Sequence, residues 1–191
     1  ITPDEYMLVK GNKLPEKYAS YGEKKSEQYI KKIVCFGDSI TQQDGSVYKE
    51  THAESGQMAK GYQSYLRELL GATVITQGYI GHTMPGILPY VKAYDYEGVD
   101  CVTLTAGAND FRYSAEEIGS PLPIGSEFNE TTYVGAFQAA IEYILNANPL
   151  CRVVIVTPIR GYTKNGDTLR VMPTTYPDAL KEIEKILEFQ K

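Results

Sequence analysis

The sequence is poor in several residue types that mark particular classes of protein. It has no tryptophan, two histidines and three cysteines among 191 residues. So few cysteines, odd in number, do not favour a disulfide framework. Each lies in or beside an apolar run, where a thiol acts as a small buried group. No apolar run is long enough to span a membrane, so we expect no membrane span.

Positive charge and phosphate-binding motifs are also scarce. The formal net charge is −5 and the pI is about 5.2, so the composition does not indicate nucleic-acid binding. Neither G-x-G-x-x-G nor G-x-x-x-x-G-K-[ST] occurs, and a nucleotide-binding protein is therefore a distant alternative. These absences leave the cellular compartment open.

The patterns that are present indicate one α/β domain over residues 30–191, preceded by an N-terminal arm or linker over 1–29. Apolar runs predict strands over 33–36, 72–76, 100–105 and 152–157. The last run has Val-Val-Ile-Val at its centre, which predicts burial on both faces. Helical patterns alternate with these strands over 60–70, within 83–96, from 132 to 148 and over 177–190. This order predicts a doubly wound, mainly parallel α/β sheet with helices on both faces.

Three of the predicted strands end in glycine followed by small polar residues. The three stretches are Gly37-Asp38-Ser39, Gly78-Tyr79-Ile80-Gly81 and Gly107-Ala108-Asn109-Asp110. Carboxyl ends of parallel strands meet at one edge of the sheet, where such folds bind their ligands. Ser39 could there act as a nucleophile, with the Gly81 N–H and the Asn109 amide as oxyanion donors. Alternatively, Asp38 and Ser39 merely cap a helix.

These stretches resemble the sequence blocks of the SGNH hydrolases, also called GDSL-type esterases and lipases. Gly37-Asp38-Ser39-Ile40-Thr41 is similar to the first block, and the stretches around Gly81 and Asn109 are similar to the second and third. The resemblance covers roughly residues 30 to 190. It implies an SGNH/flavodoxin-like three-layer α/β/α fold and a serine esterase with Ser39 as nucleophile. It implies no metal or organic cofactor.

The fourth block of this family, Asp-x-x-His, has no counterpart in the sequence. Lys49 stands three residues before His52, and Tyr79 stands three residues before His82, so neither histidine fits. The resemblance therefore implies a base beyond Lys191, together with a further strand and helix. If that strand and helix are absent, we expect a partner segment or a second copy to cover the exposed sheet edge. The alternative to an esterase is an inert binding module with the same fold, in a larger surface or phage-tail-like protein.

Further residues are candidates for supporting roles or substrate contact. We expect Asp110 to fix its turn by accepting backbone N–H bonds, as Asp38 can do beside Ser39. Residues 111–132 read as a long irregular insertion that walls the crevice, with Phe111 and Arg112 near the site. His82 could contact substrate or hydrogen-bond locally. A polar loop over 159–175 holds Arg160, a substrate contact or a surface ion pair. The expected substrates are small esters, including acetylated sugars.

Overall fold

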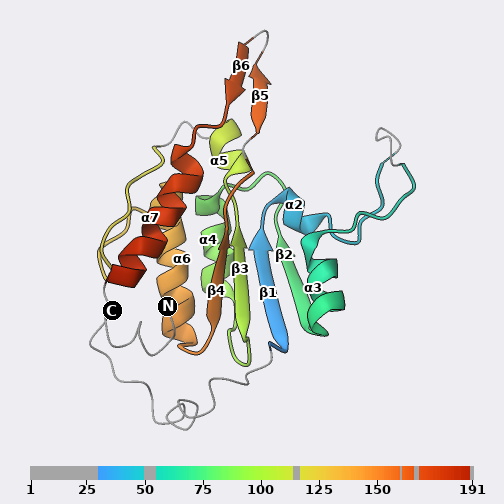
Figure 1. Cartoon of the computed structure of the whole chain (residues 1–191), viewed down its shortest axis with the longest axis horizontal. Helices are drawn as coiled ribbons and strands as arrows, with labels where there is room; N and C mark the ends of the chain where they lie inside the picture. The colour runs from blue at the N-terminus through green and yellow to red at the C-terminus, as the bar shows by residue number, and fades with distance from the viewer. Residues whose placement is uncertain (1–29, 50–54, 114–116, 160, 166–167, 190–191) are drawn as a thin grey trace.

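A four-stranded parallel sheet forms the centre of the protein (Figure 1). The computed structural model describes residues 30–49, 55–113, 117–159, 161–165 and 168–189, with the backbone alone at 162–165, 168 and 187–189. The strand order is β2-β1-β3-β4, as in a doubly wound fold. The strands are β1 (Lys32–Gly37), β2 (Thr73–Gly78), β3 (Cys101–Thr105) and β4 (Arg152–Val156).

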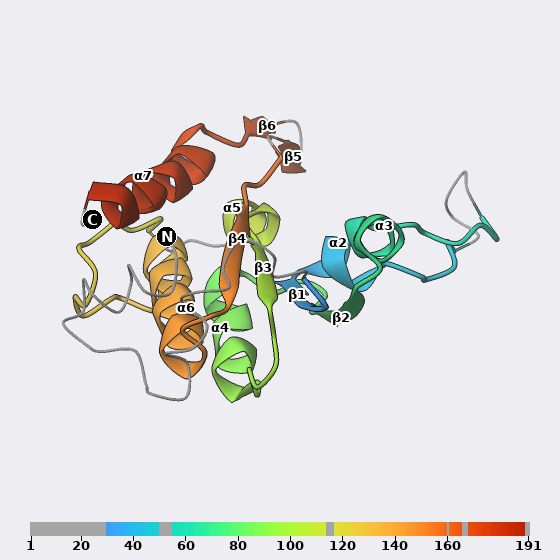
Figure 2. The same cartoon turned by 60° about the horizontal axis from the view of Figure 1, so that its bottom comes forward.

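Helices cover both faces of the sheet, as the sequence predicted (Figure 2). α3 (Tyr62–Leu70) lies on one face, where Tyr62 and Leu66 pack on β1 and β2. α4 (Met84–Ala93) and α6 (Tyr133–Ala147) lie on the other face. α7 (Thr175–Phe189) packs beside α6 and adds Leu180 and Ile183 to the larger core. Two short helices, α2 (Ser39–Gln42) and α5 (Ala108–Tyr113), lie at the carboxyl edge of the sheet (Figure 1).

The larger core lies between the sheet and the α4–α6 layer. Its fully buried members include Phe36 of β1, Leu104 of β3 and Phe137 of α6. The ring of Phe36 meets Tyr94 edge-on, with the ring centroids 5.6 Å apart. Side-chain caps define where the covering helices begin, because the hydroxyls of Thr83 and Thr132 accept backbone N–H bonds in the first turns of α4 and α6. None of the described helices is long and apolar enough to cross a membrane.

The prediction that the fourth strand is buried on both faces is wrong. β4 lies at the edge of the described sheet, and Val154 and Val156 are 46% and 38% exposed. Val153 and Ile155 pack against the larger core on the opposite face. In the described part of the chain, α3 packs on β1 and β2 and does not reach β4. The run of β-branched residues in β4 therefore indicated a strand correctly but did not indicate burial on both faces.

Two irregular segments contain more regular structure than the sequence analysis predicted. The expected loop over 159–175 contains an antiparallel hairpin, β5 (Tyr162–Asn165) with β6 (Thr168–Val171). A Gly-Asp pair at 166–167, between two runs that contain β-prone residues, is the sequence signal for this hairpin. The insertion predicted to begin at residue 111 begins later, because α5 continues to Tyr113.

Replacing Leu104 by Ala should lower the free energy of unfolding by about 2–5 kcal/mol, because the side chain is fully buried and its loss leaves a cavity. The matched control is Leu69→Ala in α3, where the side chain is 80% exposed, and it should change stability by less than about 0.5 kcal/mol. Urea denaturation measures both values. Equal losses for the two variants would contradict the described core.

Candidate active site

The register of the sheet aligns the three strand ends that the sequence analysis selected. Gly37 at the end of β1 pairs with Gly78 of β2 on one side and with Thr105 of β3 on the other. Neighbouring strands lie about 4.8 Å apart, so the segments that follow these residues emerge side by side. The chain reverses its winding between β1 and β3, which is where doubly wound folds bind ligands.

Ser39 is the first residue of α2, and Asp38 caps this helix. The Asp38 side chain accepts the Ile40 N–H at 2.9 Å, and Asp38 itself is only 2% exposed. Ser39 is partly exposed, and its hydroxyl has no hydrogen bond to any described residue. The capping alternative is thus correct for Asp38, and it leaves Ser39 available at the edge of the sheet.

Two backbone N–H groups bind the loop after β2, one to the end of β1 and one to α2. Tyr79 N–H donates to the Gly37 carbonyl at 2.8 Å, and Ile80 N–H donates to Gln42 Oε1 at 2.8 Å. The two segments approach closely, because a Cβ at Gly78 would overlap the backbone of Gln42. The residue before Gly81 is thereby bound to α2.

The same loop is bound to α5 from its other side. Asn109 Nδ2 donates to the His82 carbonyl at 3.0 Å, and the Met84 N–H donates to Asp110 Oδ1 at 2.9 Å. Asp110 therefore accepts a backbone N–H from the start of α4. The hydrogen bonds therefore join all three strand-end segments into one unit.

Several donors of this unit remain without an acceptor among the described residues. The N–H of Ser39 is the first of α2, where helix geometry supplies no partner. The Gly81 N–H likewise donates to no described group. Asn109 has a second amide hydrogen beyond the one given to His82. Three donors at neighbouring strand ends are what an oxyanion site requires.

His82, the one histidine among the described residues, makes no hydrogen bond to Ser39. His82 Nδ1 lies 3.0 Å from the Ile80 carbonyl oxygen, so the local alternative for this ring is the one observed. The ring also lies 5.7 Å from that of Tyr79 and 5.8 Å from that of Tyr90. His52 and Arg160 lie outside the described residues.

The candidate substrate contacts on α5 face different surroundings. Phe111 is buried and meets Tyr176 edge-on at 6.1 Å, which argues against the predicted substrate contact. The Arg170 guanidinium of β6 lies 5.2 Å from the centre of the Phe111 ring. Arg112 is exposed and lies over the Tyr113 ring at 5.0 Å, so its proposed contact stays a prediction.

Two buried carboxyl groups lie beneath the site. Burial raises the pKa of Asp110 to about 6, and the nearby Asp38 charge adds to the increase. Burial also raises the pKa of Asp38, although the Ile40 N–H opposes the shift. Asp110 Oδ2 has no hydrogen-bond partner within the described residues. No group of three or more His, Cys, Asp or Glu among those residues could hold a metal ion.

Sequence reasoning did not identify two features that hold the loop of Gly81. Gln42 accepts the Ile80 N–H, and only its place one turn after Ser39 could have suggested this. Tyr79 stacks on Tyr90 of α4 with ring centroids 3.9 Å apart. Tyr79 lies in the loop after β2 and Tyr90 lies in α4, so no periodicity within one element relates them.

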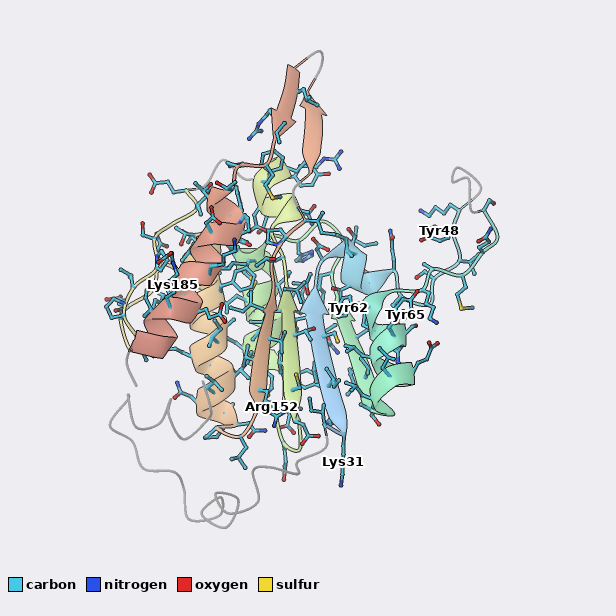
Figure 3. The ribbon with its side chains drawn as sticks, in the orientation of Figure 1. Lys31, Tyr48, Tyr62, Tyr65, Arg152 and Lys185 are labelled. Atoms are coloured by element: carbon cyan, nitrogen blue, oxygen red, sulfur yellow. The ribbon has the colours of Figure 1, made fainter. Side chains whose placement is uncertain are left out.

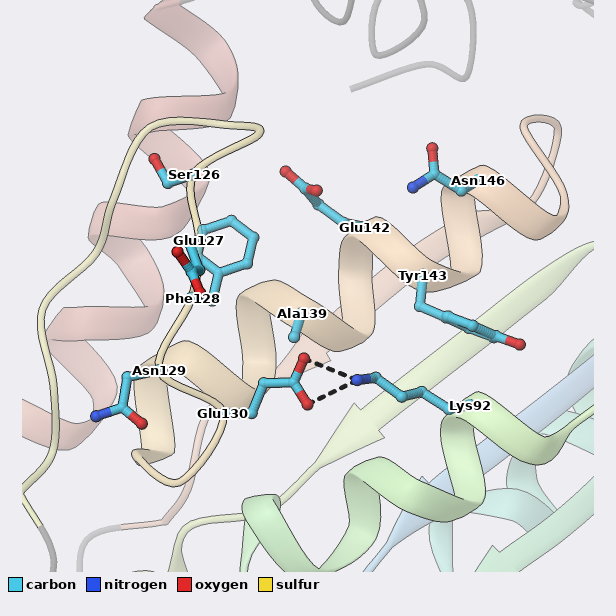
Figure 4. Close-up of a pocket in the computed structure, with 10 residues that line it drawn as sticks. All are labelled: Lys92, Ser126, Glu127, Phe128, Asn129, Glu130, Ala139, Glu142, Tyr143 and Asn146. Carbon is cyan, nitrogen blue, oxygen red and sulfur yellow. Dashed lines mark hydrogen bonds and ion pairs between the residues drawn. The ribbon is translucent and has the colours of Figure 1, made fainter.

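A separate groove of about 820 Å³ lies on the α4–α6 side of the molecule (Figure 4). Lys92 of α4 and Glu130 form a bidentate ion pair there at 2.6 and 2.7 Å, between the Phe128 and Tyr143 side chains. None of the residues at the three strand ends lines this groove.

Comparison with known families decides the assignment. The model of the GDSL-like lipase/acylhydrolase family matches residues 35–186. The chain belongs to this family. The match spans the strand ends of Ser39, Gly81 and Asn109, so the resemblance seen in the sequence is confirmed. No curated protein matches the chain significantly.

Solved structures show the same fold as this GDSL-like chain. One is a possible lipase from Chitinophaga pinensis, at 24% identity and a TM-score of 0.56, covering 83% of this chain and 62% of the other. Another is a family two carbohydrate esterase from Cellvibrio japonicus, at 17% identity and a TM-score of 0.51, covering 86% of this chain and 50% of the other. The GDSL-like chain thus spans less than two thirds of the length of either structure.

Asp110 of the GDSL-like site should make stability depend on pH. Its carboxyl ionises near 3.8 when unfolded but near 6 when folded, so ionisation between these values favours the unfolded chain. The control is Asp110→Asn, which keeps an oxygen for the Met84 N–H but cannot ionise. Relative to this variant, the free energy of unfolding of the natural protein should fall as the pH rises from about 4 to about 6. The loss should be on the order of 3 kcal/mol and level off above pH 6.

Urea denaturation of both proteins between pH 4 and pH 7 measures this difference. If the stability difference between the two proteins did not change over this range, the Asp110 carboxyl would not titrate as its burial requires.

Proposed function

We propose that the chain provides the nucleophile and the oxyanion site of a serine esterase. The observation that supports this most directly is the hydrogen-bonded unit of the three strand ends. Tyr79 N–H binds Gly37, and Asn109 binds the carbonyl of His82, so Ser39, Gly81 and Asn109 lie on segments that hold one another in place. A preorganised set of donors beside a nucleophile favours acyl transfer.

In the proposed reaction, the Ser39 hydroxyl attacks an ester carbonyl carbon and forms a tetrahedral intermediate. The N–H groups of Ser39 and Gly81 and the second amide hydrogen of Asn109 stabilise the oxyanion of this intermediate. The C–O bond to the alcohol then breaks, and water later releases the acyl group from Ser39. The proposed proton acceptor is a histidine outside the described residues, since His82 is bound to the Ile80 carbonyl.

The proposed substrates are small esters, including acetyl groups on carbohydrate. Ile40 follows Ser39 in the chain, and its side chain is 56% exposed. Ile80 precedes Gly81, and its side chain is 65% exposed. Apolar side chains next to the nucleophile suit the methyl group of an acetyl ester. The Cellvibrio japonicus protein of the same fold is a carbohydrate esterase, which supports an acetylated sugar as the alcohol side.

Replacing Ser39 by Ala should abolish hydrolysis of p-nitrophenyl acetate above background, because no nucleophile remains. Asn109→Ala should lower kcat by about 10²–10³, since one oxyanion donor is lost. Asn146→Ala, an exposed asparagine of α6, is the matched control and should leave kcat unchanged. Initial rates over a range of ester concentrations give kcat and KM for each variant.

The same assay separates the esterase from an inert binding module of this fold. Turnover by the natural chain that Ser39→Ala removes supports the esterase. Absence of Ser39-dependent turnover, in the longest available form of the protein, would overturn the proposal and favour the binding module.

A further inference from the structure

The helix that presents Ser39 is too short to maintain its own orientation. α2 has four residues, fewer than the number needed for a helix to be stable by its backbone bonds alone. Thr41 is its only buried residue and is fully inaccessible. The groups that hold Thr41 therefore determine where Ser39 lies.

Two neighbouring residues of α3 hold Thr41 from the α3 face of the sheet. The Tyr62 hydroxyl lies 3.3 Å from Thr41 Oγ1 and 3.2 Å from Thr103 Oγ1 of β3. Gln63 Nε2 donates to the Thr41 carbonyl. Figure 3 shows Tyr62 on the side of α3 that faces the strands, whereas Tyr65 lies on the outer side. Tyr62 thus connects the short helix to an inner strand.

The start of α3 is itself fixed by a buried carboxylate. Asp44, in the loop after α2, accepts the Gly61 N–H at 2.9 Å and the Ser64 hydroxyl at 2.6 Å. It also pairs with the Arg67 guanidinium at 2.7 Å, and its own side chain is only 2% exposed. The first turn of α3, with Tyr62 in it, is therefore a rigid support.

We propose that Tyr62 is a positioning residue for the nucleophile: its hydroxyl bridges Thr41 and Thr103 and so fixes α2 and Ser39 on the sheet. This inference rests on the proposed function. The Tyr62 oxygen can donate one hydrogen bond and accept another, which suits a place between two threonine hydroxyls. Burial raises the pKa of Tyr62, so the hydroxyl keeps its proton at neutral pH.

The distances set the size of the expected effect. Both contacts are longer than the roughly 2.8 Å typical of O–H···O bonds, so each bond is weak by itself. Removing the shared oxygen should therefore increase local opening of α2 by about three- to tenfold, the range of one ordinary hydrogen bond.

Amide hydrogen exchange tests this without requiring catalysis. Tyr62→Phe should speed exchange of the Gln42 and Gln43 amides, which bond to the Asp38 and Ser39 carbonyls, by that factor. Amides in α6 should change less. Tyr65→Phe removes a hydroxyl from the same helix at a residue that is 50% exposed, and it should change neither region.

A double-mutant cycle tests whether Thr41 and Tyr62 act together. Thr41→Val alone should speed exchange in α2 to a similar extent, and adding it to Tyr62→Phe should have little further effect. Where the natural protein hydrolyses p-nitrophenyl acetate, Tyr62→Phe should lower kcat several-fold with KM nearly unchanged. Unchanged exchange in α2, equal acceleration in α2 and α6, or fully multiplicative effects would overturn the positioning role. A natural protein without turnover contradicts only the proposed function.

Discussion

The parallel register at the end of β1 is the constraint on which the candidate site depends. Gly37 pairs with Gly78 and with Thr105, so three adjacent strands end at the same position along the strand direction. Two glycines here allow close approach, because a side chain at Gly37 would overlap Thr41 and one at Gly78 would overlap Gln42. A shift of one residue in either pairing would turn the side chains of the shifted strand to the opposite face, and the segments after the strands would no longer be level.

Two carboxyl groups close to these strand ends bring negative charge, which opposes binding of an anion there. Asp38 and Asp110 are both nearly inaccessible, and each raises the cost of ionising the other. Backbone N–H groups of Ile40 and Met84 compensate one oxygen of each carboxyl. Because burial raises the pKa of Asp110 to about 6, its carboxyl becomes mainly charged only above that pH.

The sequence was sufficient for the features that depend on local chemistry. Strand ends with glycine and polar residues and the alternation of strands and helices were predicted from residue type and spacing. Tertiary features could not be read in this way. The exposure of Val154 depends on which helix covers which strand, and the burial of Phe111 depends on contacts with Tyr176, sixty-five residues later. Local propensity contains neither kind of information.

The β5–β6 hairpin has a consequence for how related chains can diverge at the carboxyl edge of the sheet. It forms its own two-stranded ladder and projects from the carboxyl end of the sheet (Figure 1). The described contacts that anchor it lie at its base, where Met172 is buried and Arg170 covers Phe111. Insertions or deletions at its tip would therefore leave the main sheet's ladders and the core intact. Related chains could acquire arms of different length here while the three strand-end segments remain unaltered.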